Sequence, residues 1–211
     1  MEDKAVIIFG ATGLGKVALN IFQSRGMVAY CFLDDDKEMH NQEINDVLVM
    51  GHTQDDGFLK FIGKKCSAFV AIEDREQRLD IIEMLKTRRK VMPLNAIHDL
   101  AYVSENAYFG HGNLINVGAI VNPDAKITNH CLIHSQAVIE YEATLDEFAQ
   151  IGAGAIIGPK AHIGEGALIG AGAVVATGIK IGAGAQVAPG AVVLQNVEAE
   201  AIVFGNPAKG S

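Results

Sequence analysis

His134 is the side chain whose type and position most directly suggest chemistry. An imidazole titrates near neutral pH, so it can accept a proton from an attacking hydroxyl or amine. His134 follows the aliphatic Ile133, which the repeat described below places inside the fold, so the imidazole should point outward. At a spacing of eighteen residues its neighbours are Asn116 and Gly152, which would leave it accessible. A proton acceptor and an ordinary surface histidine both fit this position.

A glycine-rich turn near the N-terminus could hold a phosphate-bearing ligand. Gly10, Gly13 and Gly15 follow an apolar stretch and open a helical one. Acidic residues lie about twenty positions further on, as in dinucleotide-binding folds. The spacing departs from G-x-G-x-x-G and the domain is short, so we favour a nucleotide-sugar site over a nicotinamide cofactor. A purely structural turn is the third interpretation.

A zinc site like that of β-helical carbonic anhydrases is a further alternative. His98 and His134 are 36 residues apart, but the third ligand position is the inward-facing Ile139. Catalytic zinc needs three protein ligands, so the sequence disfavours this alternative and predicts no metal. The other histidines are expected on the coil surface (His111, His130, His162) or in loops (His40, His52).

The elements that would position these groups follow two patterns. Residues 1–92 alternate apolar and amphipathic stretches, which indicates a small parallel sheet with covering helices. The expected strands are Ala5–Phe9, Val28–Leu33, Val47–Met50, Ser67–Ile72 and a closing stretch at Val91–Leu94, and the expected helices run from the glycine turn to about Arg25 and over Arg75–Thr87.

From Val103 onward the period changes to six. Aliphatic or aromatic residues recur without a break at Val103, Phe109, Ile115, Val121, Ile127, Ile133, Ile139, Leu145, Ile151, Ile157, Ile163, Ile169, Val175, Ile181, Val187 and Val193. Four places after most of them stands a small residue, usually Ala, which should let the chain turn a corner. A hexapeptide repeat predicts a parallel β-helix, in which three six-residue edges form one triangular coil.

The repeat predicts a β-helix over roughly Val103–Val197 and a domain boundary near Leu94–Ala101. Short β-helices usually trimerise to cover their flanks, and the grooves between subunits then become ligand sites. A purely structural rod is the alternative.

Composition excludes several classes of partner. The formal net charge of −8 argues against nucleic acid, which requires clustered Lys and Arg. No apolar run approaches the ~20 residues that span a bilayer. Three cysteines at unrelated spacings are expected to be reduced and buried, so we expect a cytoplasmic protein with no membrane insertion.

Several short motifs, taken in order, carry a resemblance to a known family. They are Ile8-Phe-Gly-Ala-Thr-Gly13, Phe32-Leu-Asp-Asp35, Val121-Asn-Pro-Asp-Ala-Lys126, Ala137-Val-Ile-Glu140 and Gly205-Asn-Pro-Ala-Lys209. With them the chain resembles the sialic-acid O-acetyltransferases and bacillosamine-type sugar N-acetyltransferases. The resemblance implies an α/β Rossmann-like half-domain that binds a nucleotide-linked sugar (1–96), followed by a left-handed parallel β-helix acyltransferase domain (97–211).

The same resemblance implies a homotrimer with acetyl-CoA in a groove between adjacent β-helices. It places the sugar nucleotide at Gly10, Thr12, Gly13, Leu14, Asp34, Asp35 and Glu140, and the acyl donor at Gln150, Gly158, Pro159, Ala171 and Pro189. Family members often use a glycine N–H to hold the thioester carbonyl where this chain has Pro159, which has no N–H; Gly158 is the expected substitute.

The chain departs from the family at its functional positions. The family's general base is a histidine where this chain has Tyr141, a second histidine is replaced by Gln150, and a third by Leu14. A phenol with a pKa near ~10 is a poor base at neutral pH. His134 stands where the family has Asn, so the resemblance suggests a relocated base assisted by Glu142. The alternative is a degenerate trimer that binds ligands without catalysis, and the sequence does not identify the acceptor sugar or distinguish N- from O-transfer.

Overall fold

The computed structural model describes residues 5–210 of the 211-residue chain. It divides into two compact units, with the division between Asp99 and Leu100. Within the described residues, no helix is long and apolar enough to cross a membrane. The predicted fold class, an α/β half-domain followed by a left-handed parallel β-helix, is confirmed.

The first unit is built on a five-stranded sheet with the order β3-β4-β2-β1-β5. Strand β1 lies between β2 and β5 and pairs in parallel with both, and β3 forms an antiparallel hairpin with β4. The five residues of β1 are all apolar and four of them are buried, as expected for a strand covered on both faces. The strands are β1 Ala5–Phe9, β2 Ala29–Leu33, β3 Glu43–Ile44, β4 Val47–Gly51 and β5 Cys66–Val70.

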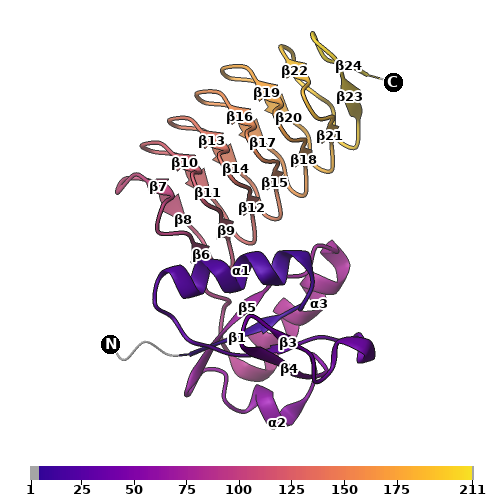
Figure 1. Ribbon diagram of the computed structural model, residues 1–211. Helices are drawn as coiled ribbons and strands as arrows, with labels where there is room; N and C mark the ends of the chain where they lie inside the picture. The colour runs from indigo at the N-terminus through magenta and orange to yellow at the C-terminus, as the bar shows by residue number, and fades with distance from the viewer. Residues whose placement is uncertain (1–4, 211) are drawn as a thin grey trace. The chain divides into compact units, whose positions relative to one another are not determined.

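Three α-helices accompany this sheet (Figure 1): α1 Gly13–Ser24, α2 Asp56–Leu59 and α3 Arg75–Met84. A 3-10 turn spans Lys37–Met39. The predicted helix at Arg75–Thr87 ends in a π-helical turn at Leu85–Arg89, and Lys90 adopts a left-handed φ of 55°. The closing stretch at Val91–Leu94 forms no strand of its own, although the Leu94 N–H donates to Ala68 of β5.

The second unit consists of three parallel sheets that share each coil (Figure 1). Sheet I contains β7 Tyr102–Val103, β10 Ile120–Val121, β13 Val138–Ile139, β16 Ile156–Ile157, β19 Val174–Val175 and β22 Val192–Val193. Sheet II contains β8 Tyr108–Phe109, β11 Lys126–Ile127, β14 Thr144–Leu145, β17 His162–Ile163 and β20 Lys180–Ile181. Sheet III contains β6 Ala96–Ile97, β9 Leu114–Ile115, β12 Leu132–Ile133, β15 Gln150–Ile151, β18 Leu168–Ile169, β21 Gln186–Val187, β23 Ile202–Phe204 and β24 Lys209–Gly210.

The predicted interior residues fill the coils. From Ile115 to Val193 every one of them is buried. Val103 and Phe109 are only half-buried, because β7 and β8 begin their sheets and have a neighbouring strand on one side only. The last strand, β24, pairs antiparallel with β23 and so ends the parallel stacking of sheet III.

The chain turns each corner of the coil at a different residue from the small one that was predicted to allow the turn. The small residue of each hexad is buried, but the residue before it makes the turn by adopting a left-handed φ. This conformation recurs every six residues from Gly112 to Gly190. Glycine occupies most of these sites, since it reaches a positive φ without steric cost. Side chains occupy the others, at Asp124, His130, Gln136, Glu142, Phe148 and Lys160.

Interior charge should be incompatible with this fold. We expect Ile151→Asp and Ile163→Asp to prevent soluble folding, because both side chains are wholly buried and an unpaired buried charge costs several kcal/mol. Gln186→Asp, at an outward-facing site of β21, is the matched control and should fold normally. Soluble expression and circular dichroism check this, and two well-folded interior variants would contradict the assignment of these residues to the core.

Candidate functional site

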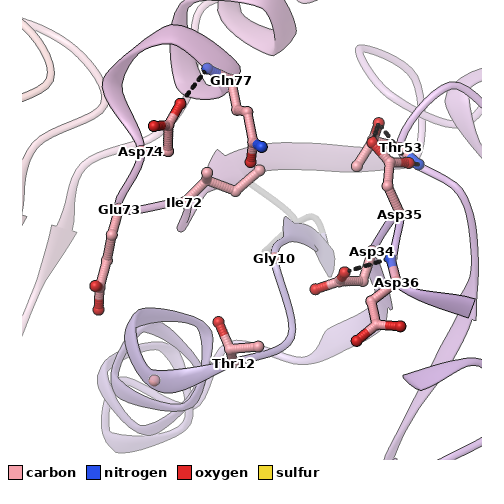
Figure 2. A pocket seen from close by; sticks show the side chains of 11 residues that line it. Gly10, Thr12, Asp34, Asp35, Asp36, Thr53, Ile72, Glu73, Asp74 and Gln77 are labelled. Atoms are coloured by element: carbon pink, nitrogen blue, oxygen red, sulfur yellow. Dashed lines mark hydrogen bonds between the residues drawn. The ribbon is translucent and has the colours of Figure 1, made fainter. Parts of the chain in front are cut away.

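The first unit contains a cavity of about 530 Å³ where the glycine turn meets the ends of β1 and β2 (Figure 2). It brings together five of the residues that the resemblance assigned to the sugar nucleotide. Its lining consists of Gly10, Thr12, Gly13, Asp34, Asp35, Asp36, Thr53, Ile72, Glu73, Asp74 and Gln77. Leu14 is an exception to the predicted set: it is 3% exposed and packs into the core instead.

The carboxylates of this cavity are held in place by backbone groups. Asp34 accepts from the N–H groups of Ala11 (2.7 Å) and Asp36 (2.9 Å), and Asp35 accepts from the N–H (2.9 Å) and hydroxyl (3.0 Å) of Thr53. Ionised carboxylates only accept hydrogen bonds. They therefore suit the hydroxyl groups of a ribose or the N–H groups of a base, and they repel phosphate.

The opposite wall offers hydrogen-bond donors. Thr12 precedes α1 without capping it through its side chain, so the first N–H groups of the helix remain available to an anion. The glycine turn is tight, because a Cβ on Gly15 would collide with the carbonyl oxygen of Gly10. The residue Gly10 has a φ of 94°, in the left-handed region. The carboxylate wall thus fits a nucleoside, and the N–H groups that begin α1 fit an anion. The Glu73 carboxylate lies beside Gly13 at that same end of α1, so a bound phosphate would have to share the space with it.

Two histidines from predicted loops, His40 and His52, lie beside Asp34 and Asp35. The Nε2 atom of His40 is 2.8 Å from the Asp34 carbonyl oxygen, and Nδ1 of His52 is 3.6 Å from the Asp35 carboxylate. Their rings meet edge to face at 4.8 Å. No local motif marks them, because β4 brings His52 to β2 only through long-range pairing.

In the second unit the predicted donor and catalytic residues separate into two groups. One group lies on sheet III or on the corner that follows it (His134, Gln150, Ala171, Pro189). The other lies on the corner between sheets I and II (Glu140, Tyr141, Glu142, Gly158, Pro159). The two groups lie at opposite ends of the sheet I strands of one chain.

A shallow apolar pocket of about 210 Å³ marks the first group. His134 and Gln150 line it, together with Gly152, Leu168, Ile169, Gly170 and Ala171. The spacing of His134 above Gly152 is as predicted. Small residues keep the surface flat, since a Cβ on Gly152 or Gly170 would collide with the backbone of the next coil. Pro189 does not line the pocket.

Hydrogen-bond donors for a thioester carbonyl differ from the prediction. The N–H of Gly158 already donates to the Val175 carbonyl at 2.8 Å, so it is not available to replace the missing N–H of Pro159. The N–H of Ala171, beside the sheet III pocket, makes no hydrogen bond with any of the described residues. Ala171 is therefore the better-placed donor.

The second group presents Tyr141 at the corner, 46% exposed. Glu142 pairs with Lys160 at 3.7 Å, and Glu140 accepts from the Asn122 amide at 3.2 Å. Because the strand β13 separates His134 from this corner, the predicted assistance of His134 by Glu142 does not occur within one chain. It would require Glu142 from another subunit.

A histidine–carboxylate pair on sheet II was not predicted from the sequence. Nε2 of His162 lies 2.7 Å from Oδ2 of Asp146. The two residues are sixteen apart, two fewer than one coil, and a search for carboxylates at that spacing from each coil histidine would have found the pair.

Neither thiol chemistry nor a metal-ligand cluster is evident in the residues that the structure describes. All three cysteines are buried, and burial, reinforced by nearby Cys66, raises the pKa of Cys31 to about 12. Between residues 5 and 210, no three His, Cys, Asp or Glu side chains are grouped to hold a metal ion.

An acidic nucleotide-sized cavity in an α/β unit, joined to a hexapeptide β-helix with an apolar surface pocket, defines a two-domain transferase of the left-handed β-helix class. Family models agree: residues 5–85 match the PglD N-terminal domain, and residues 160–195 match the bacterial transferase hexapeptide repeats. The chain therefore combines a PglD-type N-terminal domain with bacterial transferase hexapeptide repeats.

Solved structures support this assignment. A histidine-to-alanine variant of GDP-perosamine N-acetyltransferase from Caulobacter crescentus, in complex with CoA and GDP-perosamine, is 27% identical, with a TM-score of 0.89 over 98% of this chain and 96% of that chain. The acetyltransferase domain of PglB from Neisseria gonorrhoeae, in complex with acetyl coenzyme A, is 25% identical, with a TM-score of 0.89 over 99% and 100%. WeeI from Acinetobacter baumannii, at 22% identity, shares the fold with a TM-score of 0.79 over 98% and 99%. None of the curated protein sequences compared with the chain matches it.

Backbone strain at the coils of the candidate site can be measured. A non-glycine residue in the left-handed region costs roughly 1–2 kcal/mol, and Gln136 adopts a φ of 59°. We expect Gln136→Gly to raise the free energy of unfolding by about 1 kcal/mol, since glycine keeps some entropic cost. Gln186→Gly, in a strand, should lower it. Denaturant titration checks both, and a destabilised Gln136→Gly variant would show that the side chain contributes more than the strain costs.

Proposed function

We propose that this protein transfers the acetyl group of acetyl-CoA to the amino group of a nucleotide-linked sugar, in the biosynthesis of a surface glycan. The observation that carries the proposal is the match of both units to an N-acetyltransferase solved with CoA and a GDP-linked amino sugar. An amine acceptor also suits the loss of the histidine at Tyr141, because a neutral amine is a better nucleophile than a neutral hydroxyl.

The two units have separate tasks in this proposal. The acidic cavity of the first unit binds the nucleoside through its carboxylates and the diphosphate at the N-terminus of α1. The apolar pocket of sheet III binds the pantetheine end of acetyl-CoA, with the Ala171 N–H directed to the thioester carbonyl. A donor at this carbonyl stabilises the negative charge that develops on its oxygen as the amine attacks.

We further propose that the protein is a homotrimer, on the basis of the outward faces of the β-helix. Sheet I presents an apolar column from Tyr102 to Val192, and sheet III presents Leu168 and Ile202. Sheet II presents polar residues such as Lys126 and Lys180. Packing sheet I of one subunit on sheet III of the next would close a ring and leave sheet II in solvent, except along its edge toward sheet I.

In that ring the corner that carries Tyr141 would approach the sheet III pocket of the neighbouring subunit. The two separated groups of predicted residues would then line one groove, and Glu142 would reach the donor site in trans. Acetyl-CoA is a cytoplasmic metabolite, so we propose that the enzyme works in the cytoplasm.

The trimer contact can be tested at neighbouring residues of one strand. Ile156 faces outward on β16, whereas Ile157 faces the interior. We expect Ile156→Glu to yield a folded protein that sediments as a monomer, because a charge in an apolar interface is costly. Lys126→Glu on sheet II is the control and should remain trimeric. A monomeric wild type, or a trimeric Ile156→Glu variant, would refute this packing.

Donor and acceptor binding can be tested separately. Acetyl-CoA at a hundred times its Kd should stabilise the protein by about 2.7 kcal/mol in a thermal-shift titration. GDP-, UDP- and dTDP-linked 4-amino sugars should then release the CoA thiol, with Asp35→Asn as a variant that weakens acceptor binding and leaves acetyl-CoA binding unchanged. Failure to bind acetyl-CoA would refute the transferase assignment, and binding without turnover of any sugar would indicate the degenerate alternative.

A further inference from the structure

The His162–Asp146 pair has the geometry of an oriented proton acceptor. His162 begins β17, Asp146 directly follows β14, and these neighbouring strands of sheet II bring Nε2 and Oδ2 to 2.7 Å. Both side chains are partly accessible, at 44% for the histidine and 38% for the aspartate. A base held by a second residue, with one ring nitrogen open to substrate, is the arrangement that activates nucleophiles in many enzymes.

The pair lies near Tyr141, the residue that stands where the family has its basic histidine. The N–H of Lys160 donates to the carbonyl of Tyr141 at 3.1 Å, so the turn before His162 stacks on the turn that carries Tyr141. Thr144, three residues after Tyr141, is the strand partner of His162. The imidazole is therefore one coil above Tyr141 and on the same side of the β-helix.

The charged surroundings of His162 are few. Asp146 is its direct partner, and Lys180 is the next residue of the outward column on sheet II. Lys160, in the preceding turn, is paired with Glu142. Glu165 lies in the turn that follows His162. Glu147, which follows Asp146, accepts from the Asn129 amide through its carboxylate.

We propose that His162, held by Asp146, accepts the proton that the acceptor amine loses when it attacks acetyl-CoA. This inference rests on the proposed function. The Asp146 carboxylate fixes the tautomer by accepting from Nε2–H, which leaves the lone pair on Nδ1. That nitrogen makes no hydrogen bond with any described residue. His134 then forms a wall of the apolar pocket of sheet III.

The step balances without a further reactant. The amine nitrogen attacks the thioester carbon, a C–N bond forms and the C–S bond breaks, and one amine proton passes to Nδ1 of His162. The CoA sulfur leaves as a thiolate and takes this proton back from the imidazolium, which regenerates the neutral histidine. The products are the N-acetylated sugar and CoA thiol.

The test compares single-turnover rates of four variants with acetyl-CoA and whichever 4-amino sugar nucleotide the wild type uses. His162→Gln should lower the rate by 10²–10⁴-fold, the usual contribution of a general base, with an unchanged Kd for acetyl-CoA. Asp146→Asn should lower it less and move the acid limb of its pH profile. His134→Asn should raise the Kd for acetyl-CoA, and His111→Gln, an exposed histidine of another corner, should behave as wild type.

The pH profile separates a base from a structural role. In His162→Gln the acid limb that belongs to the imidazole should vanish, and added imidazole should restore part of the rate to His162→Gly. A normal rate for His162→Gln, or a 10²-fold loss for His134→Asn at unchanged acetyl-CoA affinity, would overturn the proposal in favour of His134. A wild type that turns over no sugar nucleotide would overturn the proposed function itself.

Discussion

The β-helix depends on one repeated interaction: a backbone N–H in one coil donates to a carbonyl of the next coil, seventeen residues later. His134 donates in this way to Ile151, and Gly158 to Val175. Because the bonds are parallel and in register, residues eighteen apart are stacked in columns, and the character of each column decides what its face can do. Interior columns are aliphatic, the outward column of sheet I is apolar, and that of sheet II is polar. The outward column of sheet III is mixed, since Gln150 and Gln186 lie on either side of Leu168.

The turns are strained in one part of the β-helix. From Asp124 to Phe148 five successive left-handed positions carry side chains, whereas glycine predominates from Gly154 onward. Strain of this kind persists where the surroundings over-determine the backbone, and it gathers at functional sites. Glu142, the predicted assistant of the base, occupies one of these positions.

The sequence predicts most of this architecture, since a period of six can be counted without knowledge of the structure. Val103 and Phe109 obey the pattern and are still only half-buried, because burial depends on where a sheet begins. The link between His162 and Asp146 depends on the residues per coil and on a side-chain direction, and neither is visible as a local motif. Leu14 lies within the glycine turn and still packs inward, because α1 directs that face toward the core. Gly158 was expected to offer its N–H, but the hydrogen-bond ladder uses it.

Because every coil of the β-helix has the same backbone geometry, the length of the β-helix can change only by whole coils. Each coil adds one strand to every sheet, and neighbouring strands lie about 4.8 Å apart. A gene duplication of eighteen codons would therefore lengthen the β-helix by one such step, without altering the shape of any existing coil. Deletion would shorten it by the same step. The distance between the sheet III pocket and the last coil can thus change only in whole increments, which no single substitution could achieve.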